Sequence, residues 1–477
     1  MSPGDAPSRS AESTRANARV WRRRPAASVA VATSVGSVSA GEVLAAAADV
    51  SLVLEGRARC VLLPSGDPVA FLIGLMACSQ VGVAVVPWRE GGMAFDVLVD
   101  TVRPDSILRF APGRLSDVSL EPVGGPPPPE ARVGELIMLT SGSTGAPKGV
   151  ALDFAQVMLN ALSAGAVMEV WRCDAWAIDI DMALMSALSH MLMAWQYDLP
   201  LVHLSARDPA DIVQLFAGGE TGFGGSPVQL VRLTESLPSG VAPKMLVSSG
   251  DFLSPAMIDQ VVRRFPDTHV HKLYGLTELA GRFCCMPHDD LMADKAAAGY
   301  PLPGFAARLA ADTLPGEIAE IEAKTPLMMA GYYRRGGEFE PRRWDWLATG
   351  DLGFIGPDGA ITVVGRADDV VKVGGEKVDR QSIEQALAEL LAPREYCVLG
   401  VDHPLVGQCP ALFVAPGSEG LPMPAWRDIV GHIRERLPAR FVPGLMYGLD
   451  GPLPRLANGK VDRETLKASH RQFKRLS

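Results

Sequence analysis

Short runs of Val, Ile and Leu alternate with longer stretches rich in Ala and Leu from about residue 27 to residue 365. The apolar runs fall at 59–63, 83–87, 135–139, 244–248 and 268–273. This alternation predicts βαβ units, in which helices cover both faces of a mostly parallel sheet. The fold class expected for this part is therefore a large α/β domain.

The longest apolar run, FLIGLMACSQVGVAVVPW at 71–88, is near the length of a membrane span. Ser79 and Gln80 divide it, and its second half is rich in valine, which favours strands. The pattern predicts a buried helix followed by a buried parallel strand. We therefore expect no membrane segment.

The pattern changes after about residue 317. GEIAEIEAK at 316–324 and WLATGDLGFIGPDGAITVVG at 346–365 predict strands separated by tight turns, and therefore an antiparallel meander or a distorted β-barrel. Further helices are predicted near 380–391 and 424–437, which fits a small α+β domain. We expect an N-terminal domain over 27–366 and a C-terminal domain over 367–477.

Composition restricts the partners. The chain has 477 residues, more than one hydrophobic core usually serves, and its net charge of −9 argues against nucleic acid or an anionic membrane. Its seven cysteines include no C-x-x-C pair, which indicates a reducing, cytoplasmic setting without structural zinc. Residues 1–26 are rich in Arg and Ser like a transit signal, but no sustained apolar segment follows, so we expect a disordered tail.

The stretch LTSGSTGAPKGV at 139–150 follows an apolar strand and gathers hydroxyls, glycines and one cation: Ser141, Ser143, Thr144, Gly142, Gly145, Gly149 and Lys148. Glycine permits positive φ, and hydroxyl, N–H and ammonium groups suit phosphate oxygens. A flexible linker is the alternative, but a linker needs neither a preceding strand nor a lysine. The stretch lacks the Gly-Lys-Ser/Thr end of the common P-loop, so the metal must be held elsewhere.

Four further stretches carry candidate chemistry: YGLTEL at 274–279, TGDLG at 349–353, GRADDVVKVGGEKV at 365–378 and PRLANGKVDR at 454–463. Glu278 offers a carboxylate suited to Mg²⁺, and the two oxygens of Asp351 suit the hydroxyls of a ribose. Taken singly, these stretches could be a helix N-cap, ordinary turns and an Asn-Gly hairpin turn.

Taken in order, the five stretches resemble the motifs of the adenylate-forming superfamily, which comprises acyl- and aryl-CoA synthetases, peptide-synthetase adenylation domains and luciferases. The resemblance covers about residues 27–470. It implies a large N-terminal domain hinged to a small C-terminal domain, and a reaction in which a carboxylate attacks the α-phosphate of ATP. Cations must then offset the repulsion between like charges.

The same resemblance implies a role for each matching residue. Tyr274 stacks on adenine, Thr277 contacts the α-phosphate and Glu278 carries Mg²⁺. Asp351 and Arg366 bind the ribose. Lys460 is the catalytic lysine, and Asp368 is the hinge. The residues expected to hold the ATP phosphates are Thr140, Ser141, Gly142, Ser143, Thr144, Gly145 and Lys148.

The match weakens between 171 and 226, where the family binds its acid. His190 is a candidate pocket residue or a buried structural histidine. Asp181, with Asp179, could hold a substrate amine. Gly224, Ser249 and Gly250 are expected to complete the pocket. Together with the pair Trp171 and Trp176, these residues predict a compact acid that is aromatic or carries an amino group.

The acceptor is less closely defined. Gly374, Gly375 and Glu376 resemble the hairpin that lines the thiol tunnel of CoA ligases, which favours transfer to CoA or to the phosphopantetheine of a separate carrier protein. Transfer to an amine or another small nucleophile in secondary metabolism is the alternative. A non-catalytic ATP-sensing protein would be expected to lack Lys460 or Glu278, and both are present.

Overall fold

The computed structural model describes residues 28–476, except 34–35, 92–94, 125–134, 142–146, 206, 311–312, 314–316, 368–369, 374–375, 392–393, 404–406, 418–422 and 456–460. The predicted tail at 1–26 lies outside these residues. The chain forms two compact units. The first runs to Ala306 and includes Lys324–Asp345, and the second comprises Ala307–Ala323 and Trp346–Ser477. The domain boundary predicted at residue 366 stays a prediction.

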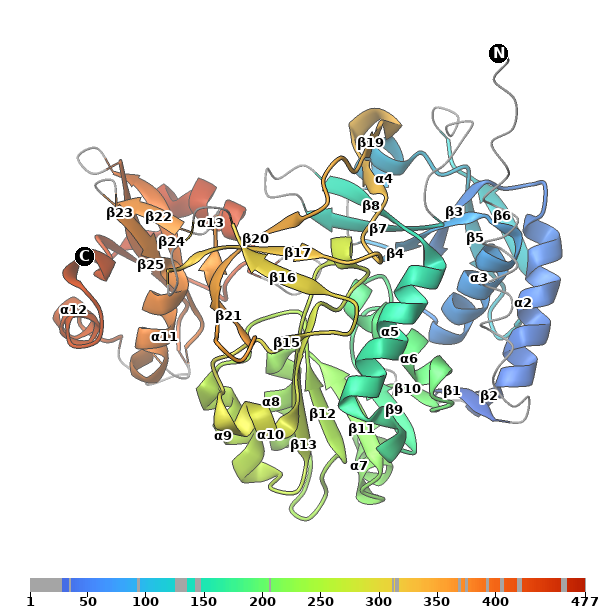
Figure 1. Cartoon of the computed structure of the whole chain (residues 1–477), viewed down its shortest axis with the longest axis horizontal. Coiled ribbons are helices and arrows are strands. Elements are labelled where there is room, and N and C mark those ends of the chain that lie inside the picture. The colour runs from blue at the N-terminus through green and yellow to red at the C-terminus, as the bar shows by residue number, and fades with distance from the viewer. Residues whose placement is uncertain are drawn as a thin grey trace. The chain divides into compact units, whose positions relative to one another are not determined.

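The described part of the first unit contains two large sheets (Figure 1). The nine-stranded sheet has the order β15 (Tyr300–Pro301), β14 (Cys284–Met286), β13 (His269–Tyr274), β12 (Met245–Ser248), β11 (Thr221–Gly225), β9 (Ala175–Ile178), β10 (Leu201–His203), β1 (Val29–Thr33), β2 (Gly36–Ser39). The eight-stranded sheet has the order β19 (Phe339–Pro341), β18 (Gly331–Tyr333), β8 (Pro147–Leu152), β7 (Leu136–Ser141), β4 (Ala84–Trp88), β3 (Cys60–Pro64), β5 (Ser106–Phe110), β6 (Val118–Pro122). Their inner strands pair in parallel, as the βαβ pattern predicts.

Four helices form the core between the two sheets: α2 (Ala40–Leu54), α3 (Pro68–Val81), α5 (Phe154–Met168) and α6 (Met185–Gln196). α3 and β4 divide the apolar run at 71–88 as predicted, and Gly82 ends the helix with a φ of 70°. α4 (Phe95–Val102) packs on the other face of the eight-stranded sheet. The remaining helices of this unit are α7 (Pro209–Ala217), α8 (Pro227–Ser236), α9 (Pro255–Arg264) and α10 (His288–Ala293).

The second unit contains two smaller sheets. The antiparallel one has the order β16 (Ala306–Leu309), β17 (Ala319–Lys324), β20 (Leu347–Ile355), β21 (Ile361–Arg366). It confirms the predicted meander, and closure into a barrel stays a prediction. The other sheet joins β23 (Glu376–Asp379), β22 (Val370–Val373), β25 (Gly407–Val414), β26 (Leu445–Gly448) and β27 (Lys474–Arg475), with β24 (Tyr396–His403) paired to β25.

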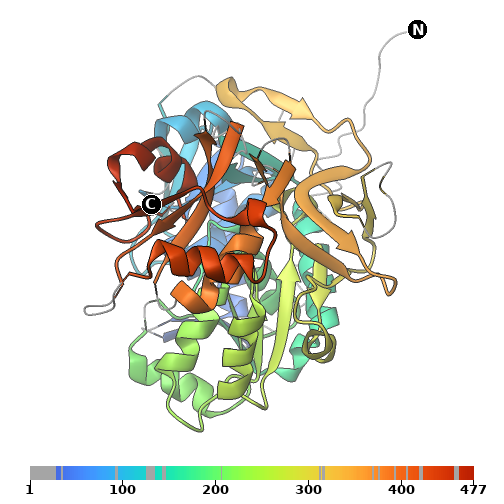
Figure 2. The same ribbon diagram turned by 90° about the vertical axis from the view of Figure 1, so that its left-hand side faces the viewer.

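Helices complete the second unit (Figures 1 and 2). α11 (Arg380–Leu391) and α12 (Trp426–Arg434) pack their apolar side chains on the sheet of β22–β26, and α13 (Arg463–Ser469) follows near the C-terminus. The α+β class predicted for this region is confirmed.

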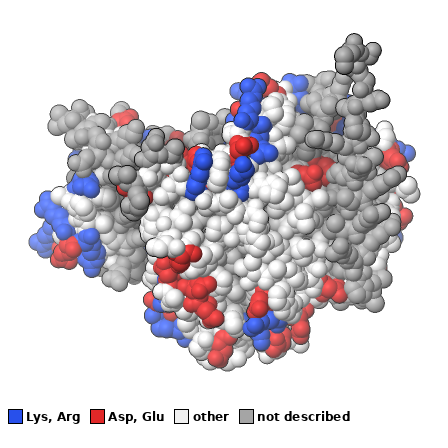
Figure 3. Space-filling model, viewed as in Figure 1, with Lys and Arg blue, Asp and Glu red and all other residues white. Residues whose placement is uncertain are grey.

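Charged side chains lie in small groups of either sign on the face shown in Figure 3, with wide uncharged areas between them. This mixture agrees with the modest net charge of −9. Among the described helices none is long and apolar enough to cross a membrane.

Candidate active site

The glycine-rich stretch joins two antiparallel strands. β7 and β8 pair so that Thr140 lies opposite Lys148. Thr140 Oγ1 is buried and has no hydrogen-bond partner among the described residues. The predicted Gly142, Ser143, Thr144 and Gly145 lie outside those residues, as does the side chain of Ser141. Of the residues predicted to hold the ATP phosphates, Thr140 and Lys148 are thus the two whose side chains are described.

Gly149 corrects one expectation, because its φ is not positive. It lies within β8, where a Cβ atom would be 2.9 Å from Ile137 Cγ2 and 3.2 Å from Tyr333 Cβ. The glycine is therefore needed for close packing between strands and not for a turn.

Lys148 forms a cluster with Glu278 and Tyr332. Lys148 Nζ lies 2.9 Å from Glu278 Oε1, and the Tyr332 hydroxyl donates a hydrogen bond of 3.1 Å to the same oxygen. Lys148 Nζ also lies 4.1 Å from the centre of the Tyr332 ring. Burial and the Glu278 charge raise the pKa of Tyr332 above its usual value, so the phenol remains a donor. Tyr332 has no counterpart among the residues predicted from the sequence.

A tight turn positions Glu278. After β13 the chain enters a short 3₁₀ helix, Thr277–Leu279, and returns in β14. A Cβ atom on Gly275 would lie 1.9 Å from the carbonyl oxygen of Gly281, which itself has a φ of 115°. Only glycine fits at both positions. The two glycines thus place Glu278 beyond the carboxyl end of β13, where α/β sheets bind ligands.

Asn160, a fully buried residue of α5, secures this turn. Its Nδ2 donates 2.7 Å to the carbonyl oxygen of Arg282, and its Oδ1 accepts 2.9 Å from the Arg282 N–H. On the other side, the Met329 N–H donates 2.9 Å to the Glu278 carbonyl oxygen. The turn that carries Glu278 is therefore held by two distant segments, and the sequence motif reveals neither.

Tyr274 and Thr277 flank Glu278. Tyr274 ends β13 and is half-buried, with its ring centroid 5.6 Å from that of Phe283. Thr277 begins the 3₁₀ helix and is also half-buried. Their assignments to adenine and to the α-phosphate stay predictions.

The predicted ribose-binding pair lies in the second unit. Asp351 on β20 is opposite Arg366 on β21, and Arg366 Nη1 lies 3.1 Å from Asp351 Oδ1. Gly350 has a φ of 75°, and a Cβ atom there would lie 2.7 Å from Arg366 Nη2. TGDLG is thus a strand segment, not a simple turn, and its glycine makes room for the arginine.

The other predicted residues of the C-terminal region, Lys460, Asp368, Gly374 and Gly375, lie outside the described residues. Arg455 and Val461, which flank 456–460, pair as an antiparallel bridge. The Asn-Gly hairpin turn expected within 456–460 lies outside the described residues and stays a prediction.

His190 is buried on α6. Its ring stacks on Trp176 with centroids 5.6 Å apart, and a Cβ atom on Gly224 would lie 2.5 Å from His190 Nε2. Burial lowers the pKa of His190 well below 6.5, so the ring is neutral near pH 7. His190 Nε2 has no hydrogen-bond partner within the described residues. Gly224 is therefore the residue that admits the imidazole.

Buried hydroxyls lie near the end of β12. Ser248 and Ser249 are 1% and 2% exposed, and their Oγ atoms have no partner among the described residues. Gly250 follows with a φ of 90°. Because β12 and β13 are parallel, these groups and the Glu278 turn follow strand ends on the same side of the sheet. Their assignment to the acid pocket stays a prediction.

Asp181 is already engaged by the protein. Its Oδ2 lies 3.3 Å from Arg89 Nε, and its Oδ1 accepts 2.8 Å from the Ala183 N–H. The two tryptophans lie in different surroundings: Trp171 is 54% exposed with its ring beside that of Tyr197, while Trp176 is buried with its ring stacked on that of His190. A short 3₁₀ helix, Val170–Arg172, turns Trp171 outward before β9 begins. Neither observation favours a site for a substrate amine.

Cys284 and Cys285 lie on β14 and are almost fully buried. Burial raises the pKa of both thiols, that of Cys285 to about 12. Both are packed, neutral thiols at pH 7.

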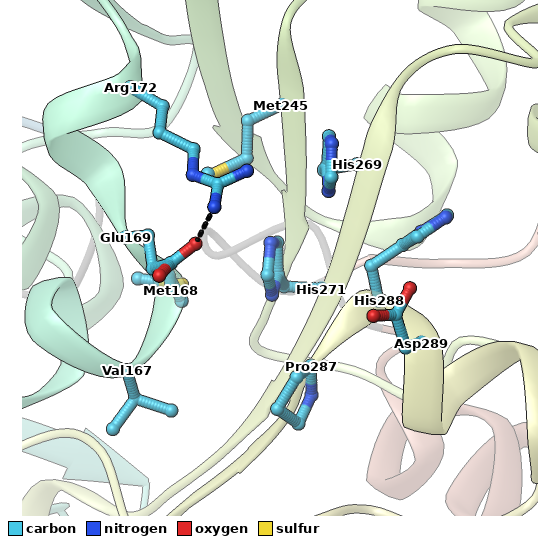
Figure 4. Close-up of a pocket in the computed structure, with 10 residues that line it drawn as sticks. All are labelled: Val167, Met168, Glu169, Arg172, Met245, His269, His271, Pro287, His288 and Asp289. Carbon is cyan, nitrogen blue, oxygen red and sulfur yellow. Dashed lines mark ion pairs between the residues drawn. The ribbon is translucent and has the colours of Figure 1, made fainter.

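A cavity lies on the opposite side of the nine-stranded sheet from the Glu278 turn, beside the first residues of β12 and β13 (Figure 4). Its volume is about 190 Å³. His269, His271 and His288 lie on one side, and the ion pair of Glu169 and Arg172 on the other. No residue predicted from the sequence lines it.

Two family models match the chain. "AMP-binding enzyme" matches residues 100–333, and "AMP-binding enzyme C-terminal domain" matches residues 382–460. A 2-succinylbenzoate–CoA ligase of Bacillus velezensis is 29% identical over 342 residues, covering 69% of this chain and 68% of that protein. The corresponding ligase of Geobacillus kaustophilus is also 29% identical over 342 residues, with the same coverage of 69% and 68%.

Solved structures share the fold. The o-succinylbenzoate CoA synthetase of Bacillus subtilis, in complex with an acyl-adenylate intermediate, matches with a TM-score of 0.79 at 21% identity over 95% of this chain and 97% of that chain. ATP-bound MatB from Rhodopseudomonas palustris matches with a TM-score of 0.81 at 22% identity, over 96% and 99% of the two chains.

Proposed function

Because this chain belongs to the AMP-binding enzymes, a family of adenylate-forming ligases, we propose that it activates a small carboxylic acid with ATP and then transfers the acyl group to CoA. The observation that carries this proposal is the cluster of Lys148, Glu278 and Tyr332 beside the glycine-rich stretch. The relatives named above are CoA ligases, which supports a thiol acceptor. An amine acceptor has no support from them.

The residues present fit ATP with Mg²⁺. Glu278 offers one carboxylate, and Mg²⁺ in nucleotide sites is usually held by one or two carboxylates together with phosphate oxygens and water. In the described part of the chain, no group of three or more His, Cys, Asp or Glu residues could hold a metal by itself. A magnesium ion bound at Glu278 would supply positive charge to the phosphates.

The protein's own residues then act by position and charge. Lys148 leaves its contact with Glu278 and binds a phosphate oxygen of ATP. Its positive charge then offsets the negative charge of the phosphates, which would repel the attacking carboxylate. Tyr332 keeps its hydrogen bond to Glu278 and so holds the carboxylate in place. The acid's oxygen bonds to the α-phosphorus, the bond to the bridging oxygen breaks, and pyrophosphate leaves. Lys460 supplies a second cation for this step.

In the second step the thiol sulfur attacks the acyl carbon, and AMP leaves with the oxygen that joined it to the acyl group. The phosphopantetheine of a carrier protein presents the same thiol and is a second acceptor to test. For the acid we retain a compact aryl compound, because Asp181 is paired with Arg89 and the named relatives act on 2-succinylbenzoate.

The test is ATP–pyrophosphate exchange over aliphatic, aryl and amino acids, with and without CoA. We expect at least one acid to support exchange without CoA, and a thioester to form only when a thiol is added. Absence of exchange with every acid, by protein that is folded and binds ATP, would refute the proposal.

A further inference from the structure

The side chain of Arg282 is an unexplained charge next to the proposed acid pocket. It follows the Glu278 turn and is 5% exposed. Arg282 Nη2 donates 3.0 Å to the carbonyl oxygen of Ser186, in the first turn of α6. His190 lies one helical turn further along α6, and Arg282 contributes to its electrostatic surroundings. The guanidinium is therefore directed toward the α6 face that carries the predicted pocket histidine.

This cation lacks a counter-charge. Among the described residues no carboxylate pairs with Arg282, and its guanidinium, which has five N–H donors, makes one hydrogen bond. Burial lowers the pKa of Arg282 only to about 10, so it is charged at pH 7. The titratable groups that share its surroundings, His190 and Cys285, are neutral at that pH.

Two other buried basic residues show how this protein usually satisfies such groups. Arg380 pairs with Glu384 at 3.1 Å, and Lys272 donates to the carbonyl oxygens of Ala296 and Ala297 at 3.4 and 3.0 Å. A buried charge without a partner is expensive, and a guanidinium is shaped to bind a carboxylate through two hydrogen bonds. Arg282 therefore calls for an anion that the described protein does not supply.

Ser189 adds an uncharged donor at the same place. Its Oγ is buried without a partner in the described residues, and a Cβ atom built on Gly281 would lie 2.6 Å from it. Since Gly281 directly precedes Arg282, the Ser189 hydroxyl lies beside the same short segment that carries the guanidinium, and both contact the turn that follows Glu278.

We propose that Arg282 binds an anionic group at the end of the substrate remote from the activated carboxylate, so that the enzyme takes dianionic acids in preference to monoanionic or amino-substituted ones. This inference rests on the proposed adenylation. Ser189 donates to the same anionic group. Arg282 thereby determines specificity and takes no part in bond making.

The test compares acids that differ only in the remote group. Each aryl dicarboxylic acid, such as 3-(2-carboxyphenyl)propanoate, is assayed beside two analogues. In one the ring carboxylate is a methyl ester, and in the other it is replaced by an aminomethyl group. Pyrophosphate release gives kcat/KM for wild type, Arg282→Gln and Arg282→Lys. Arg172→Gln removes the same charge on the opposite side of the sheet, near the first residues of β12 and β13, and serves as the matched control.

We expect wild type and Arg172→Gln to prefer the diacid by about 10²-fold, the scale of a lost buried charge pair. Arg282→Gln should remove this preference and change kcat/KM for the half-ester less than about threefold, with Arg282→Lys between the two. Equal use of diacid and half-ester by wild type, or an equal loss for both in Arg282→Gln, would overturn the inference.

Direct binding keeps the inference testable if Arg282→Gln does not fold. Calorimetry on wild type should then show tighter binding of the diacid than of its half-ester, and equal binding would refute the role of Arg282. If only monoacids gave pyrophosphate release, the proposed function would be supported and this inference would be refuted. No release with any acid would refute both.

Discussion

Replacing Tyr332 by phenylalanine removes a single hydroxyl from the centre of the site. That hydroxyl donates 3.1 Å to Glu278 Oε1, which also accepts from Lys148. When Lys148 turns to the phosphates, Tyr332 is the side chain that still holds the carboxylate. A hydrogen bond to a charged acceptor contributes about 1.5–3 kcal/mol, and a Glu278 side chain only 12% exposed is little screened by water. Because about 1.4 kcal/mol is tenfold, Tyr332→Phe should raise the Mg²⁺ concentration for half-maximal activity roughly 10- to 100-fold.

The assay is pyrophosphate release against Mg²⁺ concentration at saturating ATP and acid. Tyr333→Phe is the matched control, because it removes the same hydroxyl one residue along β18, from a ring packed on Phe339 in the core. It should lower the free energy of unfolding and leave the Mg²⁺ requirement unchanged. A Tyr332→Phe enzyme within twofold of wild type, or the same shift in Tyr333→Phe, would show that the hydroxyl does not orient Glu278.

Further changes separate the other roles. Glu278→Gln should lower the Mg²⁺-dependent rate by about 10²-fold even at saturating metal, because the amide has no anion for a hard cation; full recovery at high Mg²⁺ would contradict this. Asp351→Ala should raise the KM for ATP about tenfold with little change in kcat, and an unchanged KM would exclude the ribose contact. Lys460→Ala should slow acyl-AMP formation about 10²–10³-fold and spare transfer from synthetic acyl-AMP, whereas equal loss in both steps would contradict a role confined to the first. Burial lowers the pKa of His271 from 6.5 to about 3, so the free energy of unfolding should fall by about 1.4 kcal/mol per pH unit below pH 6.5 on its account. Urea melts of His271→Gln at pH 7.5, 6 and 5 should show a slope smaller by that amount, and an identical slope would refute the assignment.

Much of the fold could be predicted, because the periodicity of apolar residues depends on local structure. The predicted division of 71–88 into a helix and a strand agrees with α3 and β4, because Gly82 ends the helix. The helix predicted at 380–391 agrees with α11. The fold class and the family resemblance are confirmed for the same reason, since each of the five motifs is local. Gly149 was misjudged because a glycine needed for close packing and one needed for a turn look alike in sequence.

The rest of the site depends on contacts between distant parts of the chain. Tyr332 reaches Glu278 because β18 pairs with β8, and Asn160 reaches the turn from α5. Arg282 differs from an ordinary surface arginine only by its burial. Trp171 and Trp176 differ in exposure because the 3₁₀ helix Val170–Arg172 turns the Trp171 ring outward. None of these features has a sequence pattern of its own.

The most direct test follows an oxygen atom. The account requires the acid's carboxylate oxygen to bond to the α-phosphorus of ATP and to leave with AMP after transfer to the thiol. Acid labelled with ¹⁸O in its carboxylate is therefore incubated with the enzyme, ATP, Mg²⁺ and CoA, and the products are analysed by mass spectrometry. The account predicts AMP carrying one ¹⁸O atom, together with unlabelled pyrophosphate. Formation of ADP with ¹⁸O in inorganic phosphate would show attack at the γ-phosphorus and would contradict it.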